Sequence, residues 1–135
     1  MGVILDTCVL IAAEKQKINF SKITSYEEAF ITAITASELL VGVRMADNEL
    51  RRNKRSAFVE HILSSFTILP FSIEAARIHS EIHASLLKKG EVIGAYDMII
   101  AAIAVSQGYS LITGNYREFT RVASLNVINI EDLLN

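Results

Sequence analysis

The stretch GAYDMIIAAIAVSQG, residues 94–108, predicts a helix at the centre of the fold. Every residue from Met98 to Val105 is apolar, and a helix that is apolar on all sides is a buried helix. The run is shorter than the roughly 20 residues that span a bilayer. Its one charged residue is Asp97, at the start. A carboxylate beside such a helix needs hydrogen bonds, a cation or a proton. Asp97 is therefore either a first-turn residue bonded to backbone N–H groups or part of a site.

Short apolar strands alternate with helices on both sides of this stretch. Strands are predicted over residues 3–5, 29–34, 66–71, 110–113 and 125–130. Helices are predicted between them, with polar connections at residues 20–25 and 114–118 and a terminal turn at 131–135. This alternation favours a parallel sheet covered by helices on both faces. We therefore expect an α/β fold, a three-layer α/β/α sandwich with a central, mainly parallel sheet, in a single domain over residues 1–135.

Several predicted helix ends carry residues that cap helices. Thr35, with Glu38 three positions later, has the spacing of a capping box. Asp47 is the expected N-cap of the following helix. Ser72 is expected to cap the helix after that one, and Gly90 is expected to end it. These residues set the predicted boundaries.

Composition narrows the class of protein. The chain has 135 residues, of which 51% are apolar, yet no apolar run reaches membrane-spanning length and the N-terminus lacks a signal-peptide pattern. The single cysteine, Cys8, excludes an internal disulfide and suits a reducing cytoplasm. The formal net charge is −2, whereas a protein that only coats nucleic acid is usually basic. We therefore expect a cytoplasmic protein without membrane association, with apolar surface left for a partner or a second copy.

Acidic and amide side chains follow the predicted strands where these strands end. They are Asp6 after the first strand, Glu38 after the second, and Asn115 and Glu118 after the fourth. In parallel α/β sheets, sites form beyond the carboxyl ends of the strands, and Asp97 joins them if its helix begins at that edge. Taken singly, Asp6 is explained as an N-cap, Glu38 as a capping-box acid and Glu118 as a solvated charge.

A cluster of these carboxylates would need a counter-charge. Acids within a few ångströms repel one another, so a fold that gathers them needs a divalent cation or protonated acids. Oxygen ligands suit Mg²⁺ and Mn²⁺. The histidines, His61, His79 and His83, lie on two amphipathic helices away from this edge, which disfavours a zinc site. A carboxylate-held cation without a Gly-rich phosphate loop indicates metal-assisted attack of water on a phosphodiester.

Four motifs occur in order along the chain: VILDTCVLI at residues 3–11, TASELLVGV at 35–43, GAYDMIIAAIA at 94–104 and LITGNYREF at 111–119. In their order, their spacing and the total length of the chain, they resemble the PIN domain. Within that family they resemble the VapC-type toxins of bacterial and archaeal toxin–antitoxin pairs. The resemblance covers residues 3–134 and implies a PIN-like fold.

The resemblance implies an endoribonuclease that depends on Mg²⁺ or Mn²⁺ and cuts single-stranded or looped RNA. Asp6 matches the acid of the first motif, Glu38 that of the second and Asp97 that of the third. These acids are implied to be catalytic residues and metal ligands. Thr7 and Thr113 match hydroxyl positions beside the acids and are expected to support them.

The fourth motif departs from the family pattern. Asn115 stands where the family often has Asp, and Glu118, just before Phe119, is the candidate fourth catalytic acid and metal ligand. Whether Asn115 or Glu118 completes the site, and whether one metal or two bind there, stays open at the level of the sequence. Cys8 stands where Asn or Ser is common, and we assign it no chemistry.

The resemblance also implies a homodimer and a cognate antitoxin whose C-terminal tail covers the acidic groove. Arg117 and Arg121 lie near the predicted site and are candidate contacts to RNA phosphates. Tyr116 is a candidate for stacking on an unpaired base. The basic run at residues 51–55 is interpreted first as a solvated helix face, and alternatively as a contact to RNA or to the antitoxin.

Two other classes of function compete with the ribonuclease. A PIN-like domain that has lost turnover through Asn115 would bind RNA or a protein without cutting. An aspartyl phosphatase needs a second Asp two positions after the first, where this chain has Cys8. A receiver domain needs an adjacent acidic pair near its first strand, whereas Asp6 stands alone. The phosphatase and receiver alternatives therefore fit poorly.

Overall fold

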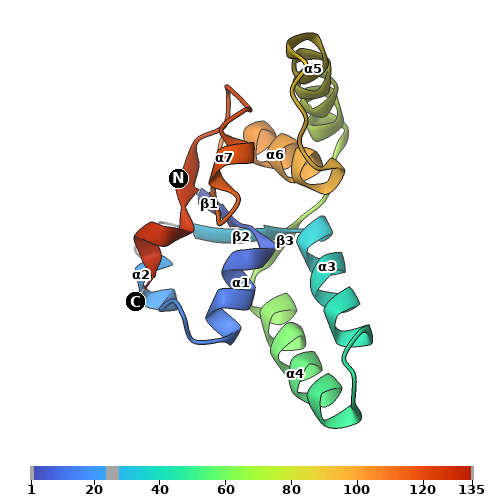
Figure 1. The fold of residues 1–135 in the computed structure, drawn as a ribbon, viewed down its shortest axis with the longest axis vertical. Coiled ribbons are helices and arrows are strands. Elements are labelled where there is room, and N and C mark those ends of the chain that lie inside the picture. The colour runs from blue at the N-terminus through green and yellow to red at the C-terminus, as the bar shows by residue number, and fades with distance from the viewer. Residues whose placement is uncertain (1, 24–27, 135) are drawn as a thin grey trace.

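The computed structural model describes residues 2–23 and 28–134 (Figure 1). In chain order the elements are β1 (Gly2–Leu5), α1 (Thr7–Glu14), α2 (Phe20–Ile23), β2 (Glu28–Thr32), α3 (Ala33–Arg44), α4 (Glu49–Ser65), β3 (Thr67–Leu69), α5 (Ile73–Lys89), α6 (Ala95–Gln107), β4 (Ser110–Thr113), α7 (Tyr116–Phe119), β5 (Val127–Asn129) and the 3-10 helix η1 (Ile130–Leu133). Strands and helices thus alternate along the chain as predicted.

In the described residues, five parallel strands form one sheet in the order β3-β2-β1-β4-β5. β1 lies in the middle because Ile4 is paired with Phe30 of β2 on one side and with Leu111 of β4 on the other. The carboxyl ends of parallel strands meet at the same edge of a sheet, which is where sites form in such folds. The predicted parallel sheet is confirmed, and the ends of β1, β2 and β4 share one edge.

Alternate residues of the strands face two separate cores. Ile4 and Leu111 pack with α5 and α6 on one face of the sheet. Leu5 and Ile112 pack with α1 and α4 on the other face. Strands that are buried on both sides show this alternation, because successive side chains point to opposite faces. The result is the predicted three-layer α/β/α sandwich.

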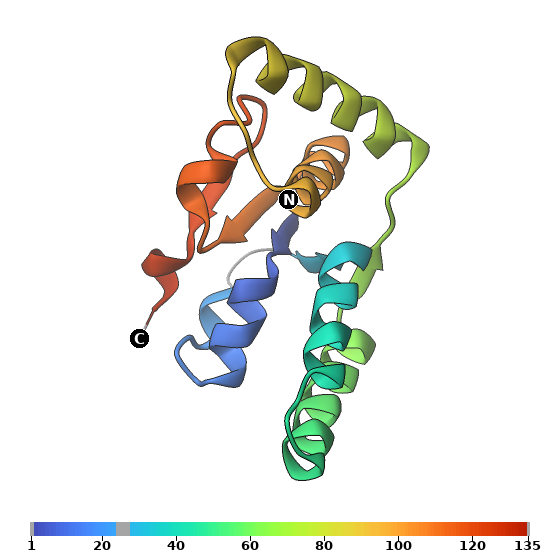
Figure 2. The same ribbon diagram turned by 45° about the vertical axis from the view of Figure 1, so that its right-hand side comes forward.

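The helix predicted to be buried is α6. Its side chains from Ile100 to Ala104 are at most 1% exposed, and α5 packs against it (Figure 2). Gly108 ends α6, and Gly90 ends α5, both in the left-handed conformation that favours glycine. Within the described ranges, no helix combines the length and apolarity that crossing a membrane requires.

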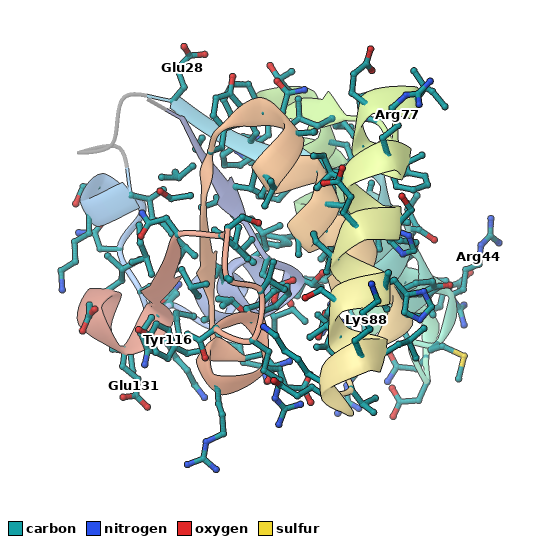
Figure 3. All side chains as sticks on the ribbon, turned by 90° about the horizontal axis from the view of Figure 1, so that it is seen from above. Glu28, Arg44, Arg77, Lys88, Tyr116 and Glu131 are labelled. Carbon is teal, nitrogen blue, oxygen red and sulfur yellow. The ribbon has the colours of Figure 1, made fainter. Side chains whose placement is uncertain are left out.

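α3 and α4 pack against each other and project from the sheet (Figure 2). Arg44, at the end of α3, extends outward from the molecule (Figure 3). On α4, Arg51 pairs with Asp47 and Arg55 pairs with Glu14, so part of the basic run is neutralised. The same helix pair and the turn between its helices also expose large apolar side chains, which are Val41, Met45 and Leu50.

β2 ends two residues earlier than predicted. Thr32 is the N-cap of α3, and its Oγ1 accepts a hydrogen bond from the Thr35 N–H at 3.2 Å. Thr35 therefore lies inside the helix, and the predicted capping box of Thr35 and Glu38 is wrong. Thr32 is paired with Leu69 of β3, so the extent of the sheet decides where α3 begins.

Other boundaries also shift. α4 is capped by Asn48, whose Oδ1 accepts a hydrogen bond from the Arg51 N–H at 2.8 Å, and not by Asp47. The predicted connection at residues 20–25 contains α2, and its last two residues lie outside the described ranges. The predicted polar turn at residues 114–118 contains most of α7. β3 and β5 are each shorter than predicted.

Candidate active site

Asp6 lies between the end of β1 and the start of α1, where it is 6% exposed. Its Oδ1 accepts a hydrogen bond from the Thr7 N–H at 2.8 Å, as an N-cap does. Its Oδ2 accepts a hydrogen bond from the hydroxyl of Thr113, the last residue of β4, at 2.7 Å. Asp6 is thus both the N-cap of α1 and a carboxylate fixed at the carboxyl edge of the sheet.

Glu38 reaches the same edge from α3. Its Oε1 accepts a hydrogen bond from the Thr7 hydroxyl at 2.7 Å. The hydroxyl oxygen of Thr35 lies 3.3 Å from that of Thr7. Thr35 is fully buried, and residues three apart on a helix share a face. Because Thr32 caps α3, Glu38 does not act as a capping acid, and its carboxylate is bonded at the sheet edge instead.

Asn115 joins Asp97 to Glu118. Asp97 lies in the first turn of α6, whose N-cap, Gly94, makes no side-chain capping hydrogen bond. Asn115 immediately precedes α7, and Glu118 lies within it. The Asn115 Nδ2 donates hydrogen bonds to Asp97 Oδ2 at 2.9 Å and to Glu118 Oε2 at 2.8 Å. The fourth motif therefore contacts the start of the buried helix.

Burial and the neighbouring acids affect the ionisation of Asp97. The pKa of Asp97 is raised to about 6, and burial is the largest cause. The negative charge of Asp6 also raises this pKa, while the hydrogen bond from Asn115 lowers it. Glu118 and Glu38 add smaller contributions in the same direction as Asp6. Like charges have such effects mainly at close range, and hydrogen bonds from Thr7, Thr113 and Asn115 connect the same carboxylates at this edge.

Cys8 has a role that the sequence analysis missed. Its Sγ accepts a hydrogen bond from the Gly114 N–H at 3.1 Å and lies 3.7 Å from Asp6 Oδ2. Burial is the largest cause that raises the pKa of this thiol, and Asp6 raises it further. Thr113 accepts a hydrogen bond from the Asn115 N–H at 2.9 Å. Cys8 and Thr113 thus hold the turn after β4. The available signal in the sequence was the position of Cys8, two residues after Asp6.

Residues 3–125 match the family model described as PIN domain. The chain belongs to the PIN domain family. Ribonuclease VapC1 from Rickettsia felis is 42% identical over 130 residues, which cover 96% of this chain and 97% of the relative. The tRNA(fMet)-specific endonuclease VapC from Salmonella typhimurium is 35% identical over 97 residues, which cover 72% of this chain and 71% of the relative. The crystal structure of DNA-bound VapBC from Salmonella typhimurium has a TM-score of 0.84 at 31% identity, covering 96% of this chain and 98% of that chain.

The side chains around the acids of this PIN domain differ in their exposure and in their hydrogen bonds. Tyr116 and Arg117 are exposed on α7, and Tyr116 is labelled in Figure 3. Arg121 is half-buried, and its guanidinium donates a hydrogen bond to the Val92 carbonyl and lies 3.9 Å from the Glu91 carboxylate. Arg121 thus links the loop before α6 to the segment after α7, whereas Arg117 is exposed.

The carboxylates at this site of the PIN domain offer oxygen atoms as metal ligands. Within the part of the chain that the structure describes, no three acidic, histidine or cysteine side chains are already arranged to enclose a metal ion. The carboxylates are instead bonded to hydroxyl and amide donors. Their chemistry nevertheless fits a hard divalent cation, because carboxylate oxygens are its preferred ligands and a cation would relieve their repulsion.

Proposed function

We propose that this PIN domain is an endoribonuclease that depends on Mg²⁺ or Mn²⁺ and acts as the toxin of a toxin–antitoxin pair. One observation carries the proposal, namely that hydrogen bonds from Thr7, Thr113 and Asn115 connect four carboxylates at the carboxyl edge of the sheet. The similarity to ribonuclease VapC1 over nearly the whole chain supports RNA as the substrate. The similarity to a tRNA(fMet)-specific endonuclease supports cleavage within an RNA chain.

The proposed metal ligands are the carboxylates at the sheet edge. Asp6 and Asp97 are the strongest candidates, because Asp6 is buried and held by hydrogen bonds at the end of β1, and Asp97 lies in the first turn of α6, where Asn115 links it to the end of β4. Glu38 and Glu118 are proposed to complete the site. When bound, a divalent cation supplies positive charge that activates water and neutralises the phosphodiester oxygens.

The neighbouring polar side chains are proposed to orient these acids. The Thr113 hydroxyl holds Asp6, and the Thr7 hydroxyl holds Glu38, through hydrogen bonds of 2.7 Å each. The Asn115 amide holds Asp97 and Glu118. Groups that are fixed before the substrate binds need little reorganisation during the reaction, which favours catalysis.

The proposed RNA-contacting side chains lie on α7. Arg117 is exposed and is proposed to contact a phosphate, and Tyr116 is exposed and is proposed to stack on an unpaired base. Both lie between Asn115 and Glu118 in the sequence. Arg121 is assigned a different role, since its guanidinium is bonded to the Val92 carbonyl in the loop that leads to α6.

The proposed protein partners are a cognate antitoxin and a second copy of the chain. Solved structures that resemble this chain are VapBC complexes, and the VapBC family comprises toxin–antitoxin systems. We propose that the C-terminal tail of the antitoxin covers the acidic groove and pairs a basic side chain with the carboxylates. The exposed apolar side chains of the α3–α4 pair, such as Met45 and Leu50, supply surface for such contacts.

The test is cleavage of a total-RNA pool by the purified chain, shown by mass spectrometry to be free of antitoxin, with Mg²⁺ or Mn²⁺ and with EDTA. The site variant is Asp97→Asn, which removes a charge without changing size. The matched control is Asp132→Asn, which makes the same change at an exposed position on η1. We expect discrete fragments from the wild type and from Asp132→Asn that disappear in EDTA and in Asp97→Asn.

Fragments that persist in EDTA, or that Asp97→Asn yields at the wild-type rate, would contradict the proposal. The competing function is a PIN-like module that binds RNA or a protein without turnover, which an amide at Asn115 in place of an acid would favour. That function predicts no cleavage with either metal, together with equal RNA binding by the wild type and Asp97→Asn.

A further inference from the structure

Asn115 contacts two of the proposed site acids with a single amide group. Its Nδ2 carries two hydrogens, which match the hydrogen bonds to Asp97 Oδ2 at 2.9 Å and to Glu118 Oε2 at 2.8 Å. Both donors of the amide are therefore used within the site. The carboxylates of Asp97 and Glu118 are linked through a neutral group.

The orientation of this amide is fixed by the groups that it faces. If the amide were turned over, its carbonyl oxygen would face two carboxylate oxygens, and all of these atoms are hydrogen-bond acceptors. The backbone of Asn115 is fixed as well, because its N–H donates a hydrogen bond to the Thr113 hydroxyl at 2.9 Å. Thr113 in turn donates to Asp6. The amide is therefore held at its backbone and at its tip.

The point occupied by Nδ2 is one where positive charge would otherwise be needed. Two carboxylate oxygens that approach a common point within hydrogen-bond distance repel each other unless a donor or a cation lies there. Asn115 supplies the donor. An Asp at this position would add a negative group instead, and the resulting cluster would need a further cation.

We propose that Asn115 fills the position between Asp97 and Glu118 and thereby limits the site to a single divalent cation. The inference rests on the proposed function, because that function supplies the cation. Asn115 is a positioning residue, since it acts through the two acids that it holds. The Asn115 amide offsets the repulsion between the carboxylates of Asp97 and Glu118. If a further carboxylate stood at this position instead, a second cation would be needed to offset the repulsion.

Replacing Asn115 should therefore change how many cations the chain binds. In Asn115→Asp, three carboxylates meet where two now share an amide, so the variant should be less stable than the wild type in the absence of metal. Adding Mn²⁺ should raise its melting temperature by more than it raises that of the wild type. Asn115→Ala removes both donors without adding charge, so it should open the same position and bind the additional ion more weakly.

The experiment is to count the Mn²⁺ ions bound per chain by equilibrium dialysis, with the purified full chain and without RNA. The control is Asn53→Asp, which adds the same charge at an exposed position on α4. We expect one ion on the wild type and on Asn53→Asp, and two on Asn115→Asp. Asn115→Ala serves as the second variant if Asn115→Asp does not fold.

Two ions on the wild type would overturn the inference and leave the proposed function standing. A folded Asn115→Asp that binds a single ion would also overturn it. If the Asp variant fails to fold, a single ion on Asn115→Ala at saturating Mn²⁺ would overturn it as well. If the wild type binds no Mn²⁺, both the inference and the metal dependence in the proposed function fail. RNA cleavage, measured separately, tests the proposed function without reference to Asn115.

Discussion

The two halves of the candidate site are held in different ways. On one side, Asp6 is buried, and its two oxygens accept hydrogen bonds from a backbone N–H and from the Thr113 hydroxyl. On the other side, Asp97 is half-buried, accepts a hydrogen bond from Asn115, and has a pKa raised to about 6. The buried half therefore supports the fold as well as the site. On the half-buried side, burial and neighbouring negative charges instead oppose the ionisation of Asp97.

The largest expected effect is at the buried half. Asp6→Ala removes the N-cap of α1, which costs about 1 kcal/mol. It also leaves the buried Thr113 hydroxyl without its acceptor, which costs about 2 kcal/mol more. We expect the free energy of unfolding to fall by about 3 kcal/mol in urea titrations without metal, with nuclease activity lost by more than about 100-fold. The exposed control Asp132→Ala should change neither, and a loss of stability below about 1 kcal/mol would remove the contrast between the two halves.

A smaller effect is expected when only the link between the halves is cut. Thr113→Val keeps the shape of the side chain but removes the hydroxyl that donates to Asp6 and accepts from the Asn115 N–H. We expect the free energy of unfolding to fall by about 2 kcal/mol and the cleavage rate to fall by roughly 10- to 100-fold. Thr67→Val, at an exposed position on β3, is the matched control. Equal cleavage rates for both variants would show that the Thr113 hydroxyl does not orient Asp6.

The half-buried side should respond in the opposite direction. Asp97→Asn can still accept the hydrogen bond from Asn115 while it removes the repelled charge. At pH 7 without metal, we expect its free energy of unfolding to exceed that of the wild type, because the repelled charge is gone. The increase should be only about 1 kcal/mol, because solvent screens the charge of a half-exposed group. A destabilised Asp97→Asn would show that the charge of Asp97 is stabilised overall and would sink this part of the comparison.

The same carboxyl gives a pH dependence of stability. The pKa of Asp97 in the folded chain is about 6, above its ordinary value of 3.8. The folded state therefore binds more protons between these values, so this group makes the chain more stable as the pH falls from 7 towards 4. The wild type should gain stability over this range relative to Asp97→Asn. Urea unfolding of both proteins at several pH values measures the difference, and parallel curves would contradict the raised pKa.

The smallest expected effect is at Cys8. In Cys8→Ser the shorter side chain weakens the hydrogen bond from the Gly114 N–H, so we expect a loss of less than about 1 kcal/mol. Because burial raises the pKa of the thiol, the wild-type cysteine should also react with iodoacetamide at pH 8 more slowly than a free thiol does. Alkylation at the rate of an exposed cysteine would show that the turn after β4 does not shield it.

Both ends of α5 are predicted correctly from local residues. The Ser72 hydroxyl caps α5 by accepting a hydrogen bond from the Ala75 N–H at 3.1 Å, and Gly90 ends that helix with a φ of 69°. The junction of β2 and α3 was predicted wrongly because Thr32 and Thr35 are both suitable caps. The pairing of Thr32 with Leu69 of β3 decides between them, and that pairing depends on the assembled sheet.

The candidate site was likewise predictable only where it depends on local features of the sequence. Asp6 directly follows a predicted strand, so the parallel topology places it at the carboxyl edge of the sheet. Asp97 joins it there because α6 begins at that edge, which the sequence pattern left as a condition. The contact between Cys8 and Gly114 spans 106 positions of sequence, and no local pattern encodes it. The two hydrogen bonds of the Asn115 amide depend on how α7 turns back towards α6, which the sequence motif does not specify.

The hydrogen bond between Asp6 and Thr113 joins residues 107 positions apart. Proteins are synthesised from the N-terminus at roughly 5–20 residues per second. At that rate Asp6 is made roughly 5 to 20 seconds before Thr113. The central strand β1 lacks its neighbour β4 throughout this interval. A nascent chain on the ribosome therefore spends most of its synthesis without an assembled site, and a prematurely terminated product that lacks β4 never acquires one.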